Sequence, residues 1–245
     1  MVWTRPSLPA IPVVWHTFQA RDGDGDDDGD GRLVTYHVQD LTEDRYEDLV
    51  DHFLIHFSSE EPMSNASGLP VVSKDQDQSG VPLWNAIFKE NMTLVCYKEG
   101  SNEIIGANIL AVRDKENYLA NEIKAGEQHY VILDILDYVS KQLNYSELYG
   151  IANRLVAYGL SVNKRYRRRG IATEILKARV PMCKALGIKL AAHSFSAPGS
   201  QRAAAKAGYR TDFEITYDDL AKLGSKYALP GIKSKYFKVM SFLIE

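Results

Sequence analysis

The feature that most constrains the fold of this chain is an apolar run that leads through an arginine-rich turn into a helical pattern. Residues 155–162 are mainly apolar, and their composition is typical of a β-strand. Residues 164–169 contain four arginines and one lysine, and Gly170 follows them. Beyond Gly170, apolar residues recur at helical spacing, with residues 171, 175 and 176 on one face. The stretch predicts a strand, a cationic turn and a helix in immediate succession.

A turn of this kind can bind an anion. The first N–H groups of a helix have no partner within it, and the helix dipole favours negative charge at that end. Gly170 and Ala172 would let a ligand approach the backbone closely, because their side chains are absent or small. The arginine side chains add bidentate donors for phosphate oxygens. We therefore expect a phosphate-bearing ligand at this turn.

The turn resembles the acyl-CoA site of the GNAT N-acetyltransferase superfamily, whose signature Arg167-x-x-Gly170-x-Ala172 matches. The resemblance implies the GNAT acetyltransferase fold, an α/β architecture whose mixed central sheet has splayed parallel strands flanked by helices. It also implies acetyl-CoA as the cosubstrate, with no metal. The residues that would contact acetyl-CoA here are Leu160, Ser161, Val162, Arg167, Arg168, Arg169, Gly170, Ile171, Ala172 and Thr173.

A second stretch resembles the family's other CoA element, Ser-x-x-x-Ser-x-Arg-x-x-x-Lys-x-Gly-Phe/Tyr. The matching positions are Ser196, Ser200, Arg202, Lys206, Gly208 and Tyr209. Ser200 is also expected to be the N-cap of an alanine-rich helix. Vertebrate members carry a catalytic tyrosine four residues before the glycine, where this chain has Ala204. A different proton donor is therefore required. We expect Ser196 or Ser200 in that role, although either could only position the cosubstrate or act through water.

Two adjacent carboxylates lie at the end of the first predicted helix. From composition alone, Glu60 and Glu61 would be a solvated acidic pair at a helix end. The pattern Phe57-x-x-x-Glu61-Pro62, however, resembles the insect arylalkylamine N-acetyltransferases, in which the glutamate before the proline is the general base. Pro62 also biases Glu61 toward an extended backbone. The resemblance thus implies Glu61 as the base, with Glu60 as its acidic neighbour.

Periodicity elsewhere predicts alternating strands and helices, which indicates a mixed α/β sheet. Strands are expected at residues 13–18, 33–38, 93–97, 104–112, 188–193, 213–217 and 236–244. Helices are expected to begin after residues 42, 80, 131, 170 and 200. His52 and His56, four residues apart on the first helix, lie off its apolar stripe and lack the glutamate of a zinc-protease motif, so we expect them to face solvent.

Length and composition limit the remaining possibilities. The 245 residues suggest one GNAT domain at 33–245, preceded by an extension at 1–32 that contains an acidic Asp/Gly loop. The net charge of −3 gives no general attraction to nucleic acid or to an anionic membrane. The two cysteines suggest a reducing compartment. No signal-peptide pattern occurs, and no apolar run approaches the ~20 residues that span a bilayer. We expect a cytoplasmic monomer.

The expected activity is transfer of an acetyl group from acetyl-CoA to an arylalkylamine such as dopamine, tyramine, serotonin or octopamine. Agmatine, a polyamine or another non-aromatic amine is an alternative substrate, and a silent acyl-CoA-binding module is an alternative function. The basic run at residues 164–169 also fits a nucleic-acid or nuclear-import module. Loop Ser64–Gly80 and residues 145–153 are expected to form pocket walls, with Trp84, Tyr145 and Tyr149 as aromatic candidates or as core residues.

We predict that the acidic loop, Asp22–Asp30, is dispensable. It is charged, rich in glycine and without an apolar anchor, so its deletion should scarcely change the melting temperature or turnover. From Asp24 it matches the first half of an EF-hand, but Thr35 stands where the bidentate glutamate belongs. Melting with and without calcium checks this prediction. A stabilisation by calcium that disappears with the deletion would contradict it.

Overall fold

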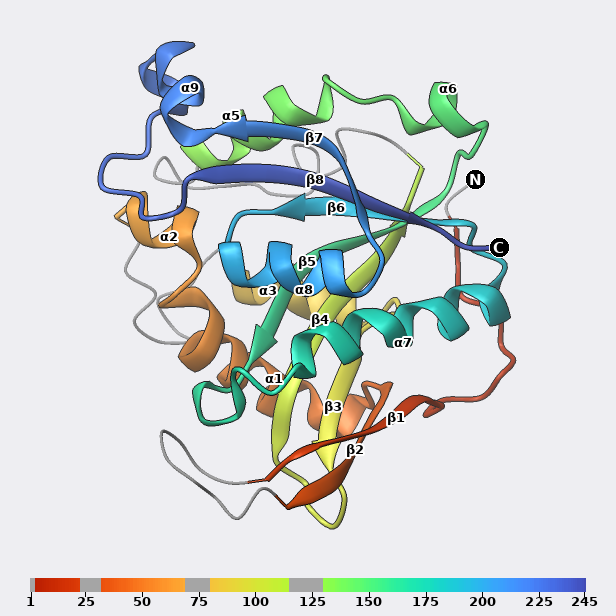
Figure 1. Cartoon of the computed structure of the whole chain (residues 1–245). Coiled ribbons are helices and arrows are strands. Elements are labelled where there is room, and N and C mark those ends of the chain that lie inside the picture. The colour runs from red at the N-terminus through yellow and green to blue at the C-terminus, as the bar shows by residue number, and fades with distance from the viewer. Residues whose placement is uncertain (1–2, 23–31, 69–79, 115–129) are drawn as a thin grey trace.

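The computed structural model describes residues 3–22, 32–68, 80–114 and 130–245 and shows one mixed sheet between layers of helices (Figure 1). The strands are β1 (Val14–Arg21), β2 (Leu33–Asp40), β3 (Leu94–Lys98), β4 (Ile104–Arg113), β5 (Arg154–Val162), β6 (Leu190–Phe195), β7 (Arg210–Thr216) and β8 (Tyr236–Leu243). The α-helices are α1 (Tyr46–Phe53), α2 (Pro62–Ala66), α3 (Gly80–Phe88), α5 (Tyr130–Ser140), α6 (Tyr145–Tyr149), α7 (Ile171–Leu186), α8 (Pro198–Lys206) and α9 (Tyr217–Lys222).

The sheet has the order β1-β2-β3-β4-β5-β6-β8-β7. Neighbouring strands are antiparallel except β5 and β6, which are parallel and share only one paired position, Leu155 with Ala191. Beyond that pair the two strands continue to Val162 and Phe195 without further pairing. The mixed sheet with splayed central strands that the sequence resemblance implied is therefore present.

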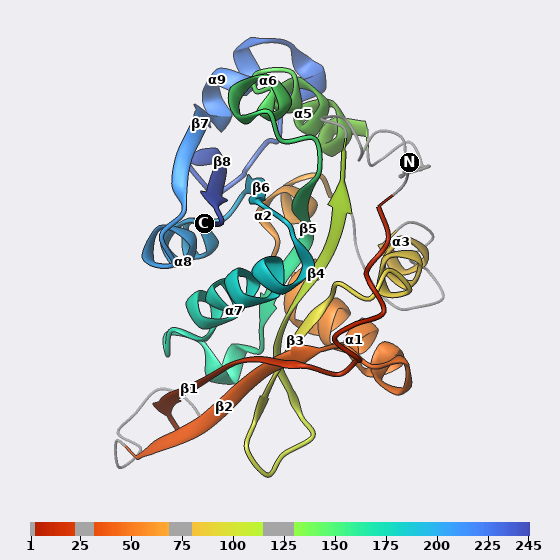
Figure 2. The same cartoon turned by 90° about the vertical axis from the view of Figure 1, so that its right-hand side faces the viewer.

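Helices cover both faces of the sheet. In Figure 2, α7 and α8 lie on one side of the central strands and α1 and α3 on the other. Each layer buries its own apolar cluster against the sheet, the first around α7 and the second around Phe53, Trp84 and Phe88. A third cluster joins α5 and α9 to β6 and β8. β4 lies at the centre, and every residue in it except Arg113 is buried, which explains why its sequence is apolar or small apart from Asn108 and Arg113.

The first predicted helix is built differently from its expected form. A 3₁₀ turn (η1, Glu43–Arg45) precedes α1, and a π-helical turn (η2, Leu54–Ser58) follows it. Pro62 stops this element and also begins α2, where a proline at the first position costs no hydrogen bond. The start of the predicted loop Ser64–Gly80 is therefore helical, and residues 69–79 lie outside the described residues.

The N-terminal segment is integrated into the sheet. β1 pairs with β2 along Val14–Arg21, so the predicted boundary at residue 32 falls between two paired strands. Residues 23–31, which include most of the acidic loop and its EF-hand half-match, lie outside the described residues. Asp22 itself pairs with Lys98 Nζ at 2.8 Å. A deletion of residues 23–30 would therefore spare this ion pair.

The cysteines and the helices of the described part of the chain can be compared with the sequence. Cys96 and Cys183 are free and buried, so neither forms a disulfide. Among the helices that the structure describes, none combines the length and the apolar character that a bilayer crossing requires.

A buried ion pair anchors the N-terminal segment. Asp40 accepts hydrogen bonds from Arg5 (2.8 and 2.9 Å), from the Val13 backbone N–H (2.9 Å) and from Trp15 Nε1 (2.8 Å). The Arg5 and Asp40 side chains are only 4% and 1% exposed. Arg5 also lies over the Trp15 ring.

We predict that Asp40→Ala destabilises the protein by about 3–5 kcal/mol, because it leaves the Arg5 charge buried without its partner. The free energy of unfolding in urea measures this loss. Asp48→Ala is a matched control, since its pair with Arg45 is exposed, and it should change stability by less than about 1 kcal/mol. Equal effects of the two substitutions would show that the Arg5–Asp40 pair is not a structural anchor.

Candidate functional site

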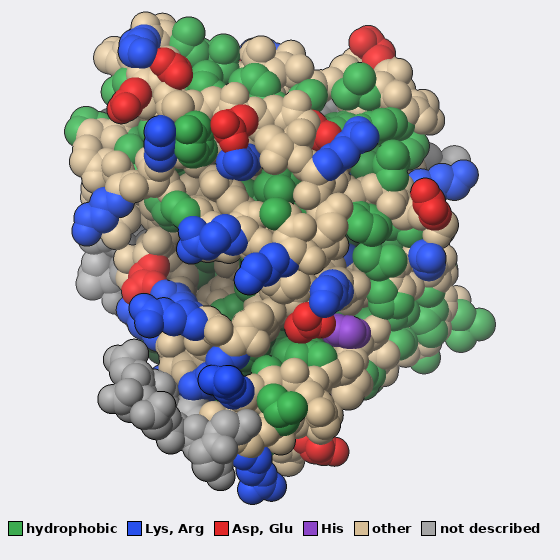
Figure 3. Space-filling model, in the orientation of Figure 1, with side chains coloured by type: hydrophobic (Ala, Val, Ile, Leu, Met, Phe, Trp, Pro, Cys, Tyr) green, Lys and Arg blue, Asp and Glu red, His purple; other side chains and the backbone are tan. Residues whose placement is uncertain are grey.

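A cavity of about 750 Å³ lies where β5 and β6 part. One side is formed by the corner between η2 and α2, together with α3 and α5, and the other by the arginine turn, α7 and α8. Figure 3 shows a hollow on the face that carries α7 and α8, with Lys and Arg side chains gathered around it. The cavity thus connects a cationic surface to the opposite face of the sheet.

The arginine turn has the predicted strand–turn–helix form. β5 ends at Val162, a 3₁₀ turn (η4, Lys164–Tyr166) follows, and α7 begins at Ile171. Arg168 and Gly170 both have positive φ, 66° and 81°, a conformation that favours glycine. No side chain caps the N-terminus of α7. The helix end therefore presents backbone N–H groups to the cavity, as an anion site requires.

Nearly all of the residues predicted to contact the cosubstrate line this cavity. They are Leu160, Ser161, Val162, Arg167, Arg168, Gly170, Ile171, Ala172, Thr173, Ser196, Ser200, Arg202 and Lys206. Arg169 is not among the lining residues. Its guanidinium lies over the Tyr166 ring, 5.4 Å from the centroid, and Tyr166 is buried. The turn therefore directs Arg169 into the protein rather than toward the cavity.

Arg167 joins the turn to the opposite layer. Its guanidinium pairs with Glu60 and donates to the carbonyls of His56 (2.9 Å) and Val162 (3.0 Å). Lys164 Nζ lies 2.7 Å from the other Glu60 oxygen. Burial opposes ionisation of Glu60, but hydrogen bonds from Lys164 and Arg167 dominate and lower its pKa. Glu60 is consequently an ion-paired carboxylate at the rim.

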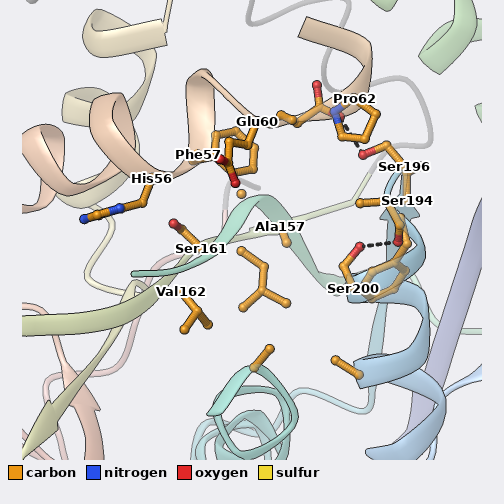
Figure 4. A pocket seen from close by; sticks show the side chains of 18 of the residues that line it. His56, Phe57, Glu60, Pro62, Ala157, Ser161, Val162, Ser194, Ser196 and Ser200 are labelled. Carbon is orange, nitrogen blue, oxygen red and sulfur yellow. Dashed lines mark hydrogen bonds between the residues drawn. The ribbon is translucent and has the colours of Figure 1, made fainter. Parts of the chain in front are cut away.

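Glu61 has a different environment from its neighbour. Its backbone is extended (φ −65°, ψ 123°), as expected before a proline, and it is the N-cap of α2. Glu61 Oε2 accepts from the Ser64 N–H at 2.6 Å, and Oε1 accepts from Ser196 Oγ at 2.5 Å. The hydrogen bond to Ser196 crosses the cavity from α2 to the end of β6, next to Pro62 in Figure 4.

The backbone of Ser196 is itself fixed by two hydroxyl groups. Its carbonyl accepts from Ser234 Oγ at 2.7 Å and from the Tyr217 hydroxyl at 3.4 Å. Burial, with a smaller contribution from the Glu61 charge, raises the pKa of Tyr217. Tyr217 therefore stays protonated and remains a donor. These two residues, distant in sequence from Ser196, were not predicted as part of the site.

Ser200 does not cap its helix as predicted. α8 begins at Pro198 with Ala197 as its N-cap, because proline is well suited to the first helical position. Ser200 Oγ instead donates to the Ala197 carbonyl at 2.9 Å within the first turn. It still lines the cavity together with Ser196 (Figure 4).

The wall around Glu61 is largely apolar. Its apolar side chains include Phe57, Met63, Leu83, Ile132, Leu136 and Phe237. The three aromatic residues proposed from the sequence do not line the cavity: Trp84 packs against Phe53, and Tyr145 stacks on Tyr149. Ile132, Leu136 and Phe237 come from segments far from Glu61 in sequence, so no local pattern identified them.

β5 approaches α1 very closely behind this wall. The pairing of β4 with β5 shifts between Ile109 and Leu110, which forms an irregularity next to Gly159. A Cβ atom built on Gly159 would lie 2.5 Å from Phe53 Cε1. Glycine is therefore required here by the close approach of a helix side chain.

The prediction that His52 faces solvent is wrong. It is buried, because α1 packs the side that carries His52 against β5. The His52 Nε2 atom lies 3.1 Å from Ser161 Oγ. Burial, with a smaller contribution from His56, lowers the pKa of His52 to about 3, so the ring is neutral. Within the described residues, no group of three or more His, Cys, Asp or Glu side chains could hold a metal ion.

The similarity of this chain to known proteins is found among solved structures. No family model and no curated protein matches the sequence. A crystal structure named as arylalkylamine N-acetyltransferase 7 of the yellow fever mosquito Aedes aegypti is 42% identical, with a TM-score of 0.88, and the match covers 99% of this chain and 100% of that one.

Two further structures share the fold at lower identity. Arylalkylamine N-acetyltransferase 2 of Aedes aegypti is 20% identical, with a TM-score of 0.74 over 86% of this chain and 99% of that one. A Drosophila melanogaster polyamine N-acetyltransferase, described as forming N-acetylagmatine, is 20% identical, with a TM-score of 0.72 over 85% of this chain and 100% of that one.

We predict that Gly170→Val weakens acetyl-CoA binding at least tenfold, about 1.4 kcal/mol. Its φ of 81° disfavours a β-branched residue, so the N–H groups at the start of α7 would be displaced. Titration calorimetry with acetyl-CoA measures the dissociation constant.

Gly187→Val is the matched control, because Gly187 has a φ of 70° at the other end of the same helix, also with open space around it. It should reduce stability but leave acetyl-CoA affinity unchanged. A folded Gly170→Val protein with wild-type affinity would exclude the turn as the binding site.

Proposed function

Because this chain belongs to the insect arylalkylamine N-acetyltransferase family and is an acyl-CoA-dependent N-acetyltransferase of the GNAT fold, we propose that it acetylates the primary amine of an arylalkylamine from acetyl-CoA. The observation that carries this proposal is the position of Glu61. Its carboxylate lies on a largely apolar wall of the cavity and bonds across the gap to Ser196. A cationic turn forms the other end of the same cavity.

The cationic end is suited to CoA. Arg168, Arg202 and Lys206 line the cavity near the uncapped N-terminus of α7. Together they offer charged donors and backbone N–H groups to a pyrophosphate and a further phosphate. The thioester arm would then extend between β5 and β6 toward Glu61.

The apolar end favours an aromatic amine over a polyamine. The carboxylates among the described lining residues are Glu60 and Glu61, and Glu60 is already paired with Arg167 and Lys164. A substrate with one ammonium group and an aromatic ring would match one carboxylate and an apolar wall. A second cationic group, as in agmatine, would find no unpaired carboxylate among these residues.

In the proposed reaction the substrate ammonium first gives a proton to Glu61. The neutral amine attacks the thioester carbon, a C–N bond forms, and the carbonyl electron pair moves to oxygen. Backbone N–H groups of β5 near Leu160–Val162 are candidates to stabilise this oxyanion. The C–S bond then breaks, its electron pair leaves with sulfur, and the thiolate takes a proton from Ser196 or Ser200, directly or through water. The new amide nitrogen gives its second proton to that serine oxygen by the same route, and Glu61 releases the first proton to solvent.

We predict that Glu61→Ala lowers turnover by about 10²–10⁴-fold, the usual contribution of general-base assistance. Acetyl-CoA affinity should survive, because the arginine turn is a separate element. The acidic limb of the pH–rate profile should flatten, since protonation of the base would no longer limit the rate. Glu61→Gln, which can keep the bond from the Ser64 N–H, should be equally impaired.

Glu60→Ala is the matched control at the neighbouring position, and it should retain most of the turnover. If Glu60→Ala is the crippled variant, or if both variants are nearly as active as wild type, Glu61 is not the base.

We expect the wild-type protein to prefer arylalkylamines over agmatine and spermidine by at least tenfold in kcat/KM. A thiol-release assay with dopamine, tyramine, octopamine, serotonin, agmatine and spermidine measures this preference. A preference for agmatine would favour the polyamine alternative. Absence of turnover on a wider amine panel, together with tight acetyl-CoA binding, would indicate the silent module.

A further inference from the structure

His193, on β6, lines the cavity although it is not part of any motif described above. The residue is 6% exposed. The hydrogen-bond partner of its ring is Nη1 of Arg179, which lies 3.0 Å from Nε2 and 3.2 Å from Nδ1. Its ring also lies 4.4 Å from that of Phe195. No other described group hydrogen-bonds to this imidazole.

This contact can satisfy the acceptor nitrogen of the imidazole but not its N–H group. A guanidinium group has N–H donors and no acceptor, whereas a neutral imidazole has one acceptor nitrogen and one N–H. Burial and the nearby Arg179 charge lower the pKa of His193 well below its usual range, so the ring is neutral. Whichever ring nitrogen carries the proton, Arg179 cannot accept it, so the His193 N–H has no acceptor among the described residues.

Arg179 is itself unusual. It is only 1% exposed, and it donates to Asn108 Oδ1 (2.7 Å from Nε) and to the Tyr209 hydroxyl (3.1 Å) as well as to His193. In the described part of the chain it forms no ion pair with a carboxylate. Burial raises the pKa of the neighbouring Cys183 thiol to about 12 despite the Arg179 charge. Among the residues that the structure describes, Arg179 is thus a buried cation without a carboxylate partner.

The position of Arg179 connects it to both strands that border the cavity. Asn108, which Arg179 holds, donates from Nδ2 to the Gly159 carbonyl on β5 at 2.6 Å. His193 belongs to β6. The guanidinium thus reaches β5 through Asn108 and β6 through His193, and of these two residues His193 lines the cavity.

We propose that His193 is a further catalytic residue, whose ring N–H donates to the atom of the acyl donor that gains negative charge, and that Arg179 is the positioning residue behind it. This inference rests on the proposed binding of acetyl-CoA in the cavity. During acyl transfer, negative charge develops first on the thioester oxygen and then on the departing sulfur. A fixed donor, supported by a buried positive charge, can stabilise negative charge on the oxygen or on the sulfur. Its effect is larger in a site that excludes water than in one open to solvent.

Steady-state kinetics with acetyl-CoA and one saturating amine test the role of His193. His193→Leu should lower kcat about 100-fold, as loss of one oxyanion donor does elsewhere, with a change in KM for acetyl-CoA below about threefold. His193→Gln retains an N–H donor and should recover at least about tenfold of that loss. Arg179→Met should lower kcat in the same way, and Arg179→Lys, which keeps the charge, should lower it less.

Binding distinguishes the two acceptor atoms and does not depend on turnover. Titration with CoA and with desulfo-CoA should show tighter binding of CoA by wild type if the acceptor is sulfur, and His193→Leu should abolish that preference. If the acceptor is the thioester oxygen, His193→Leu should keep the CoA preference but lose kcat. Unchanged kcat and unchanged CoA preference in a folded His193→Leu protein would overturn the proposal.

Equal kcat losses in His193→Leu and His193→Gln, without an altered CoA preference, would also overturn it, because the ring would then be only a packing element. Failure of the proposed function has a different signature. In that case wild type would not turn over any amine, whether or not it binds acetyl-CoA, and there would be no kcat for the His193 variants to lower.

Discussion

The parting of β5 and β6 is the constraint on which the rest of the site depends. The two strands pair at Leu155 and Ala191 and then separate, although both continue. Strand backbone groups that lose their neighbours need other partners, so an interrupted ladder in the middle of a sheet can be maintained only by surrounding structure or by a ligand. The helices on the two faces supply that surrounding structure. The cavity is therefore a consequence of the sheet itself, with walls from both layers.

The same separation gives two consecutive carboxylates different environments. Glu60 lies at the rim, where Arg167 and Lys164 pair with it across the gap. Glu61 points into the cavity and bonds to Ser196 and to the backbone of α2. The change of direction between them comes from Pro62, which ends one helical element and begins another. One proline thus separates an ion pair that joins the two layers from the carboxylate that faces the cavity.

Local sequence patterns predicted the elements whose conformation is determined by residues close together in the sequence. The strand–turn–helix stretch around Gly170 and the extended backbone of Glu61 follow from periodicity, glycine conformation and the restriction before proline, and the structure contains both. The π-helical turn at Leu54–Ser58 and the burial of His52 depend on how α1 packs against β5. The spacing of apolar residues within the helix does not indicate this packing. The same is true of the apolar wall, since residues such as Phe237 reach it only through the strand order of the sheet. Arg169 shows the limit of a motif, because it stands at a position that the signature leaves unspecified and packs on Tyr166 instead of lining the cavity.

The contact between Gly159 and Phe53 also bears on how the protein can diversify. A side chain on Gly159 would collide with an aromatic ring that is fully buried. Gly159 on β5 is therefore closed to substitution unless α1 moves, and such a movement would disturb the core beneath it. Residues on α2, α3 and α5 line the same space without that restriction. Changes of substrate during evolution would accordingly accumulate in the helices around the cavity, while Gly159 stays constant.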